Sequence, residues 1–160
     1  MNISTTLTSS RAPICTVLIR LMVGAVFMSE GIQKFLFPAD LGPGRFATIG
    51  LPSPGVLAPL VGTFEIGCGL LVVLGLLTRV AVIPLLVIIL TAIWKTKLPL
   101  LLKSGLWRMA HEARTDWCML LGCLFLLIFG AGPLALDARR RKGAATAPKR
   151  RADLGGDFRG

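Results

Sequence analysis

The sequence predicts an all-α integral membrane protein, folded as a four-helix bundle. Hydrophobic residues make up 54% of the 160 residues and charged residues only 16%, whereas about 25% of residues are charged in soluble domains. The apolar residues gather in four long stretches, and about 20 residues in a helix cross the ~30 Å hydrocarbon core. Because lipid offers no partner for an open strand edge, each stretch is predicted to be a helix.

The first stretch defines how the chain enters the membrane. Residues 1–10 carry no charge and Arg20 interrupts the apolar run, so we expect a retained span rather than a cleaved signal peptide. A short N-terminal cytoplasmic segment, 1–12, precedes the membrane domain, 13–137. Within that domain the predicted spans are about 13–36, 55–77, 80–97 and 116–136.

The connections between spans differ in character. Residues 77–79 leave so little room that the second and third spans are predicted to form a tight hairpin. The third span is short and crosses if Arg79 and Lys95 extend their charges to the two interfaces, and Pro84 should bend it. The Gly- and Pro-rich connection 37–54 is predicted to be an ordered irregular loop. The connection 98–115 mixes leucines with cations and is predicted to lie in the membrane interface.

Charge predicts the orientation. The chain carries a net charge of +10, and residues 138–160 hold eight Lys/Arg and two acids, so we expect a basic, disordered cytoplasmic tail. Ten Lys/Arg fall on the side of the termini and seven on the other. The positive-inside rule therefore places both termini in the cytoplasm, with the chain in the inner or plasma membrane. The basic residues are not interleaved with aromatics, so we predict lipid rather than nucleic acid as their partner.

Three ionisable side chains, Arg20, Glu30 and Glu65, fall inside apolar sequence. Each costs about 2.5–3.5 kcal/mol at the centre of a membrane helix, so such residues normally face the bundle interior. Glu30 and Glu65 are expected at similar depth, Arg20 could reach towards them, and Lys34 lies four residues after Glu30. One interpretation is that these charges only hold the helices together. The other is a ligand-binding polar pocket on the outer face for a proton, a quinone head group or a small polar ligand.

A second polar group, His111, Glu112 and Asp116, precedes the fourth span. It is either a solvated loop or an acid–base or quinone-contacting cluster at the mouth of the pocket. One histidine with two carboxylates is a weak metal signal, and we predict no metal site. The four cysteines form no C-x-x-C pair and are expected as free thiols, with a disulfide between spans as the alternative. They are Cys15, Cys68, Cys118 and Cys123.

Glycines recur at a spacing of seven on two spans. Gly24 and Gly31 share one face of the first span, and Gly62 and Gly69 share one face of the second. Small residues let helix backbones approach closely in lipid. The glycines therefore predict close packing of helices, with a ligand seated against them as the alternative.

The spacing of these residues resembles a known family. The first span contains R-x-x-x-G-x-x-F-x-x-x-G-x-x-K from Arg20 to Lys34, and the second contains G-x-x-E ending at Glu65, followed by L-T-R ending at Arg79. Together these resemble the DoxX family of four-helix membrane proteins, over about residues 12–137. The combination is far more specific than any one piece.

The resemblance implies an accessory or quinone-interacting subunit of a membrane redox or oxidative-stress system. The family is named after a subunit associated with an archaeal thiosulfate:quinone oxidoreductase, and a mycobacterial member is linked to a complex with superoxide dismutase and a sulfurtransferase. Arg20, Lys34, Glu65 and Arg79 match by position, but no catalytic residue carries over. We therefore expect a non-catalytic subunit rather than an autonomous enzyme. The chain has no cofactor motif of its own, so a partner redox enzyme or a bound quinone would carry the electrons.

The alternative function is a small-molecule transporter or binding module that uses the same pocket, with a proton moving through Glu65. Four spans without inverted repeats argue mildly against an autonomous secondary transporter. A homo-oligomer could supply the second half, so a second copy of the chain stays open as a partner.

Overall fold

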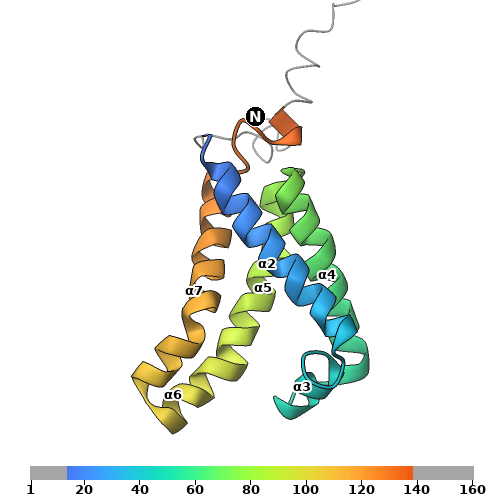
Figure 1. Ribbon diagram of the computed structural model, residues 1–160, viewed down its shortest axis with the longest axis vertical. Helices are drawn as coiled ribbons and strands as arrows, with labels where there is room; N and C mark the ends of the chain where they lie inside the picture. The colour runs from blue at the N-terminus through green and yellow to red at the C-terminus, as the bar shows by residue number, and fades with distance from the viewer. Residues whose placement is uncertain (1–13, 139–160) are drawn as a thin grey trace, which may run out of the picture.

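The computed structural model describes residues 14–138, which form helices joined by turns and contain no strand (Figure 1). The predicted all-α fold is confirmed for this range. The predicted cytoplasmic segment 1–12, and the predicted tail from residue 139 on, lie outside the described residues. The helices in chain order are α2 (Thr16–Leu36), α3 (Pro43–Thr48), α4 (Pro54–Leu74), α5 (Thr78–Ala92), the π-helical turn η1 (Ile93–Lys97), α6 (Leu98–Ser104) and α7 (Leu106–Phe129).

Three of the described helical segments are long and apolar enough to cross a membrane. They are Thr16–Leu36, Pro54–Leu74 and the continuous run Thr78–Ser104. Helix α7 packs beside them as the fourth helix of the bundle, but its first half is charged, and its own crossing stays a prediction. Leu18, Val56 and Leu121 are exposed while Arg20 and Glu65 are buried. This inverted pattern is typical of a surface in contact with lipid.

The helices form two arms. The first arm consists of α2, α3 and α4, and the second of α5, η1, α6 and α7, with contacts between α4 and α5 and between α2 and α7 joining them. Figure 1 shows the arms converging where α2 begins and α7 ends, and diverging towards α3 and α6. We call these the closed end and the open end. The buried core between the arms includes Val23, Val72, Leu85 and Leu126.

Helices α2 and α4 approach closely through the two glycine pairs. A Cβ atom on Gly24 would lie 2.6 Å from the carbonyl oxygen of Gly69, and one on Gly31 would lie 2.6 Å from that of Gly62. Real Cβ contacts are not this short, so a side chain at either position would push the backbones apart. The predicted close packing of the glycine faces is confirmed.

Glycines and one strained leucine set the helix ends. Gly75 and Leu77 have φ angles of 71° and 45°, which reverse the chain within three residues and form the predicted tight hairpin between α4 and α5. Gly105 and Gly130, with φ of 79° and 81°, bound α7. It therefore begins before the predicted Asp116 and ends before the predicted Leu136.

Two further segments differ from the predicted boundaries. The connection 37–54 contains the short helix α3 rather than only irregular loop, and the third span continues through η1 into α6. Pro84 lies inside α5 without ending it. The π-helical turn at Ile93–Lys97 sits at the open end, and such turns are frequent at functional sites.

Candidate functional site

The closed end is held together by Arg20, whose side chain is 4% exposed. Its Nε donates to the carbonyl oxygen of Val72 at 3.1 Å, and its Nη2 donates to that of Val73 at 2.9 Å. Its Nη1 donates to the carbonyl oxygen of Ala131 at 2.9 Å. The first two carbonyls belong to the last turn of α4, where a helix lacks internal donors. Arg20 therefore joins α2, α4 and the segment after α7.

The prediction grouped Arg20 with Glu65, and the structure places it elsewhere. Arg20 does not line the cavity that contains Glu65. The predicted depths suggested only that the long side chain of Arg20 could reach the level of Glu65. Helix-end carbonyls lie closer to the guanidinium and take all three of its hydrogen bonds, because buried carbonyls and a buried cation each require a partner.

Two more polar residues complete the closed end. Oδ2 of Asp137 accepts a hydrogen bond from the backbone N–H of Leu77 at 2.6 Å, and the backbone N–H of Asp137 donates to the carbonyl of Gly75 at 3.3 Å. Nη2 of Arg79 donates to the carbonyl of Ile128 at 2.9 Å, near the end of α7. The arginine of the L-T-R motif thus joins α5 to the end of α7, and Asp137 stabilises the turn between α4 and α5.

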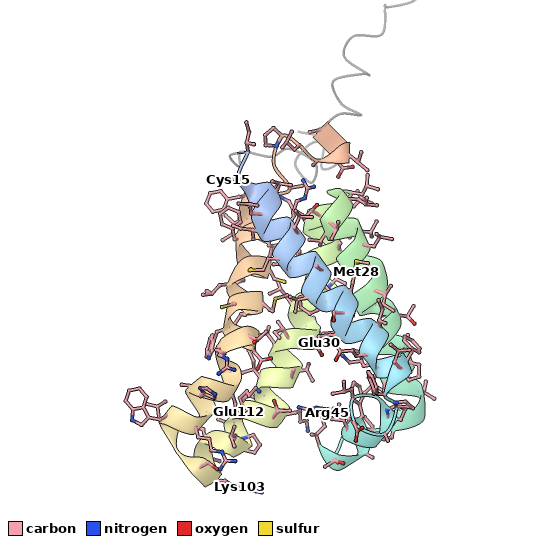
Figure 2. All side chains as sticks on the ribbon, in the orientation of Figure 1. Cys15, Met28, Glu30, Arg45, Lys103 and Glu112 are labelled. Atoms are coloured by element: carbon pink, nitrogen blue, oxygen red, sulfur yellow. The ribbon has the colours of Figure 1, made fainter. Side chains whose placement is uncertain are left out.

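The open end contains a cavity of about 530 Å³ between the arms. This volume is within the range of small-molecule sites. Figure 2 shows Glu30 on α2 and Arg45 on α3 beside the space between the arms, and Glu112 on α7 at the other side. The apolar wall includes Val26, Phe27, Leu57, Val61, Ile88 and Met119. An apolar wall with a few charged groups is typical of a ligand site.

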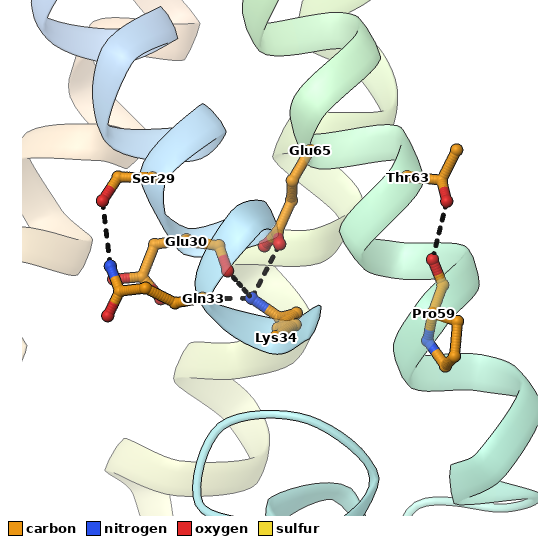
Figure 3. Close-up of polar contacts among 7 residues, drawn as sticks. All are labelled: Ser29, Glu30, Gln33, Lys34, Pro59, Thr63 and Glu65. Carbon is orange, nitrogen blue, oxygen red and sulfur yellow. Dashed lines mark hydrogen bonds and ion pairs between the residues drawn. The ribbon is translucent and has the colours of Figure 1, made fainter. Parts of the chain in front are cut away.

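A buried ion pair lies in the first arm (Figure 3). Nζ of Lys34 lies 2.7 Å from Oε2 of Glu65 and 4.0 Å from Oε2 of Glu30. The side chains of Glu65, Lys34 and Glu30 are 4%, 11% and 52% exposed. Lys34 also donates to the backbone carbonyl of Glu30 at 3.3 Å. The predicted neighbours Glu30, Lys34 and Glu65 therefore do meet, on the wall of the cavity.

A second ion pair lies in the second arm. Nζ of Lys97 lies 3.1 Å from Oδ2 of Asp116 and donates to the backbone carbonyl of Glu112 at 2.9 Å. Lys97 is one of the seven cations counted on the side opposite the termini, and its place after an apolar span on the side of Lys34 is a signal for this contact. None of Lys97, Arg45 and Lys95, which all line the cavity, was predicted as a site residue.

The structure divides the predicted mouth cluster. Glu112 and Asp116 line the cavity. His111 is exposed and does not line it, and its Nε2 lies 2.7 Å from Nη1 of Arg114 on the same helix. The three residues lie in α7 rather than in a solvated loop, because Gly105 starts the helix early. A role at the mouth thus remains a hypothesis for the two carboxylates.

All four cysteines are free and none pairs with another, with Cys123 buried and Cys68 partly buried. Between residues 14 and 138, no group of three or more His, Cys, Asp and Glu side chains could hold a metal ion. Neither observation assigns chemistry to these residues. The ion pairs and the cavity remain the principal candidate site.

Known proteins resemble this chain in sequence. The model of the DoxX family matches residues 15–98, a range that contains Arg20, Lys34, Glu65 and Arg79. An uncharacterized membrane protein of Mycobacterium tuberculosis is 51% identical over 147 residues, covering 88% of this chain and 90% of that protein. No solved structure matches.

Proposed function

This chain belongs to the DoxX family of membrane proteins, and we propose that it is a quinone-interacting accessory subunit of a membrane redox system. The cavity at the open end is its ligand site. One observation carries the proposal: a predominantly apolar cavity of about 530 Å³ has a buried ammonium–carboxylate pair, Lys34 and Glu65, on its wall. A quinone head group needs an apolar slot and a donor for its carbonyl oxygens.

The residues present fit such a group. Phe27, Val61, Ile88 and Met119 supply apolar contacts from both arms. The Lys34 ammonium has three donors, and Glu65 together with the Glu30 backbone occupies part of that capacity. A remaining N–H can therefore donate to a carbonyl oxygen in the cavity. Glu65 keeps the ammonium charged and oriented, because a buried cation without a partner is costly.

The proposed orientation puts the cavity outside the cytoplasm. The start of α2 and the end of α7 lie together at the closed end (Figure 1). If the basic termini are cytoplasmic, as the positive-inside rule predicts, the open end faces the opposite surface. The electrons for the quinone would then come from a membrane or peripheral redox enzyme that reaches this face.

The test measures how much quinone stays bound to the full-length protein after purification in mild detergent. Wild-type protein is expected to retain quinone on solvent extraction and mass analysis. Glu65→Gln should lower the retained quinone about tenfold to a hundredfold, because Lys34 loses the charged partner that aims it into the cavity. Asp40→Asn is the matched control, since Asp40 is an exposed carboxylate outside the cavity lining.

Two results would count against the proposal. One is wild-type protein free of quinone even when purified from quinone-rich membranes. The other is equal retention in Glu65→Gln and wild type. Counterflow of a small solute in proteoliposomes, lost in Glu65→Gln, would instead favour the transporter alternative. The transporter alternative uses the same cavity, with Glu65 as the group that carries the proton.

A further inference from the structure

Three titratable side chains form a series from the exposed edge of the cavity to its buried wall (Figure 3). Glu30 is 52% exposed, Lys34 is 11% exposed and Glu65 is 4% exposed. Lys34 lies between the two carboxylates, 4.0 Å from one and 2.7 Å from the other. We propose that Glu30 and Lys34 form a proton-transfer route from the mouth of the cavity to Glu65. The physiological use of this route rests on the proposed function.

The transfer balances without any further reactant. The N–H bond of the Lys34 ammonium breaks, and its proton forms an O–H bond with Oε2 of Glu65. The free electron pair on Nζ then takes the proton of a protonated Glu30 carboxyl. The net change moves one proton from Glu30 to Glu65 and leaves Lys34 as it was. Glu30 regains its proton from water, to which it is exposed.

The geometry requires a small motion at one step. The contact between Lys34 and Glu65 is already within hydrogen-bond length, whereas the 4.0 Å separation from Glu30 is not. Rotamer changes in exposed side chains take picoseconds to nanoseconds, and Glu30 is half exposed. Nζ already donates to the backbone carbonyl of Glu30 at 3.3 Å. The ammonium is thus anchored on the helical turn that carries Glu30.

The other charged groups on the cavity wall are worse carriers. Arg45 on α3 cannot lose a proton in a protein. Lys97 of η1 is engaged by Asp116 of α7 in the second arm. Lys95 and Glu112 are exposed and form no ion pair with a described residue, so water screens their charges. Lys34 is the described titratable group that pairs with Glu65.

The route gives Glu65 a defined role in ligand chemistry. Reduction of a quinone consumes two electrons and two protons. The partner redox enzyme supplies the electrons, and Glu65 supplies the two protons one after the other at the buried wall, being reprotonated between the two transfers. Returning Glu65 to its protonated state then depends on Lys34 and Glu30. Loss of either residue should therefore slow the reprotonation of Glu65.

The discriminating variant is Lys34→Arg. Arginine keeps the positive charge and the ion pair with Glu65 but cannot release a proton, so a purely structural role tolerates it. We would use full-length protein in nanodiscs after quinone extraction. A rapid drop in pH is followed by infrared detection of the protonated Glu65 carboxyl, identified as the band missing in Glu65→Gln.

Wild-type Glu65 is expected to take up its proton quickly, and Lys34→Arg and Glu30→Gln should each slow this uptake at least about tenfold. Asp40→Asn, which removes an exposed carboxylate outside the cavity lining, should leave the rate unchanged. Thermal melting checks folding. If Lys34→Arg fails to fold, Glu30→Gln decides, because Glu30 is half exposed and tolerates the change.

Equal uptake rates in wild type, Lys34→Arg and Glu30→Gln would overturn the route. Absence of any Glu65 carboxyl band over the pH range in which the protein stays folded would do the same. The samples contain no quinone, so these results are independent of quinone retention. A protein that shows the route but retains no quinone refutes the proposed function alone.

Discussion

The two ends of the bundle use the same kinds of charged residue for different purposes. At the closed end, the cations Arg20 and Arg79 are bound to backbone carbonyls, and Asp137 binds a backbone N–H. At the open end, Lys34 and Lys97 instead pair with the side chains of Glu65 and Asp116 around a cavity. Backbone groups cannot change their charge, whereas carboxylates can.

The difference shows that a buried charge in a membrane helix does not by itself mark a ligand site. Arg20 is a buried charge in a membrane helix, which by default is a candidate for a functional residue. Its three hydrogen bonds nevertheless all go to backbone carbonyls. Lys34 lies nearer the end of its apolar stretch than Arg20 does, but it lines the cavity. The partner atoms and the adjacent space separate the two roles.

The largest expected effect is at the closed end. Arg20→Met removes the hydrogen bonds to the carbonyls of Val72, Val73 and Ala131, so we expect a loss of about 4 kcal/mol in the free energy of unfolding. Denaturant titration in mixed micelles measures it. Arg108→Met, at an exposed position in α7, should change stability by less than about 0.5 kcal/mol. Equal stability of Arg20→Met and wild type would remove the distinction between the two ends.

An intermediate effect is expected at the close contact between α2 and α4 in the first arm. Gly24→Ala places a Cβ atom 2.6 Å from the carbonyl of Gly69, and we expect a loss of about 1–3 kcal/mol. Gly67→Ala meets nothing within 4 Å and should gain up to about 1 kcal/mol from helix propensity. The two variants should shift the unfolding midpoint in opposite directions, and a shared sign would contradict the packing argument.

The smallest expected effect on stability is at the open end. Asp116→Asn removes the ion pair with Lys97, but these side chains are 21% and 15% exposed. Partly exposed ion pairs contribute about 1 kcal/mol or less, so the midpoint of thermal unfolding should barely move. A loss above about 2 kcal/mol would mean that the open end is also primarily structural. Lys103→Gln on α6, outside the cavity lining, is the control for loss of a charge.

Much of the fold could be predicted from local pattern. The apolar stretches predicted the helices, residues 77–79 predicted the hairpin, and the glycine spacing predicted the contact between α2 and α4. The boundaries of α7 were missed, because charged residues before Asp116 suggested a loop while Gly105 and Gly130 decide where the helix begins and ends. Hydropathy reports where lipid begins, and a helix can extend beyond that point.

The candidate site was predicted only in part. Placing Glu30, Lys34 and Glu65 together was correct, because one helical turn joins Glu30 to Lys34 and similar depth brings Glu65 near them. Arg20 was misplaced, and Arg45, Lys95 and Lys97 were missed. Depth along the membrane normal can be counted from the sequence, but the direction that a side chain faces depends on how each helix is rotated against its neighbours.

Composition and hydropathy are enough to establish that lipid is the solvent of this chain, that its apolar stretches are helical, and that its few interior charges need partners. These follow from composition and from the cost of bare polar groups in hydrocarbon. The packing of the helices sets which partner each charge has: backbone carbonyls for Arg20, and Glu65 for Lys34. Partner choice depends on helix crossing and rotation, which long-range packing sets and local sequence does not encode.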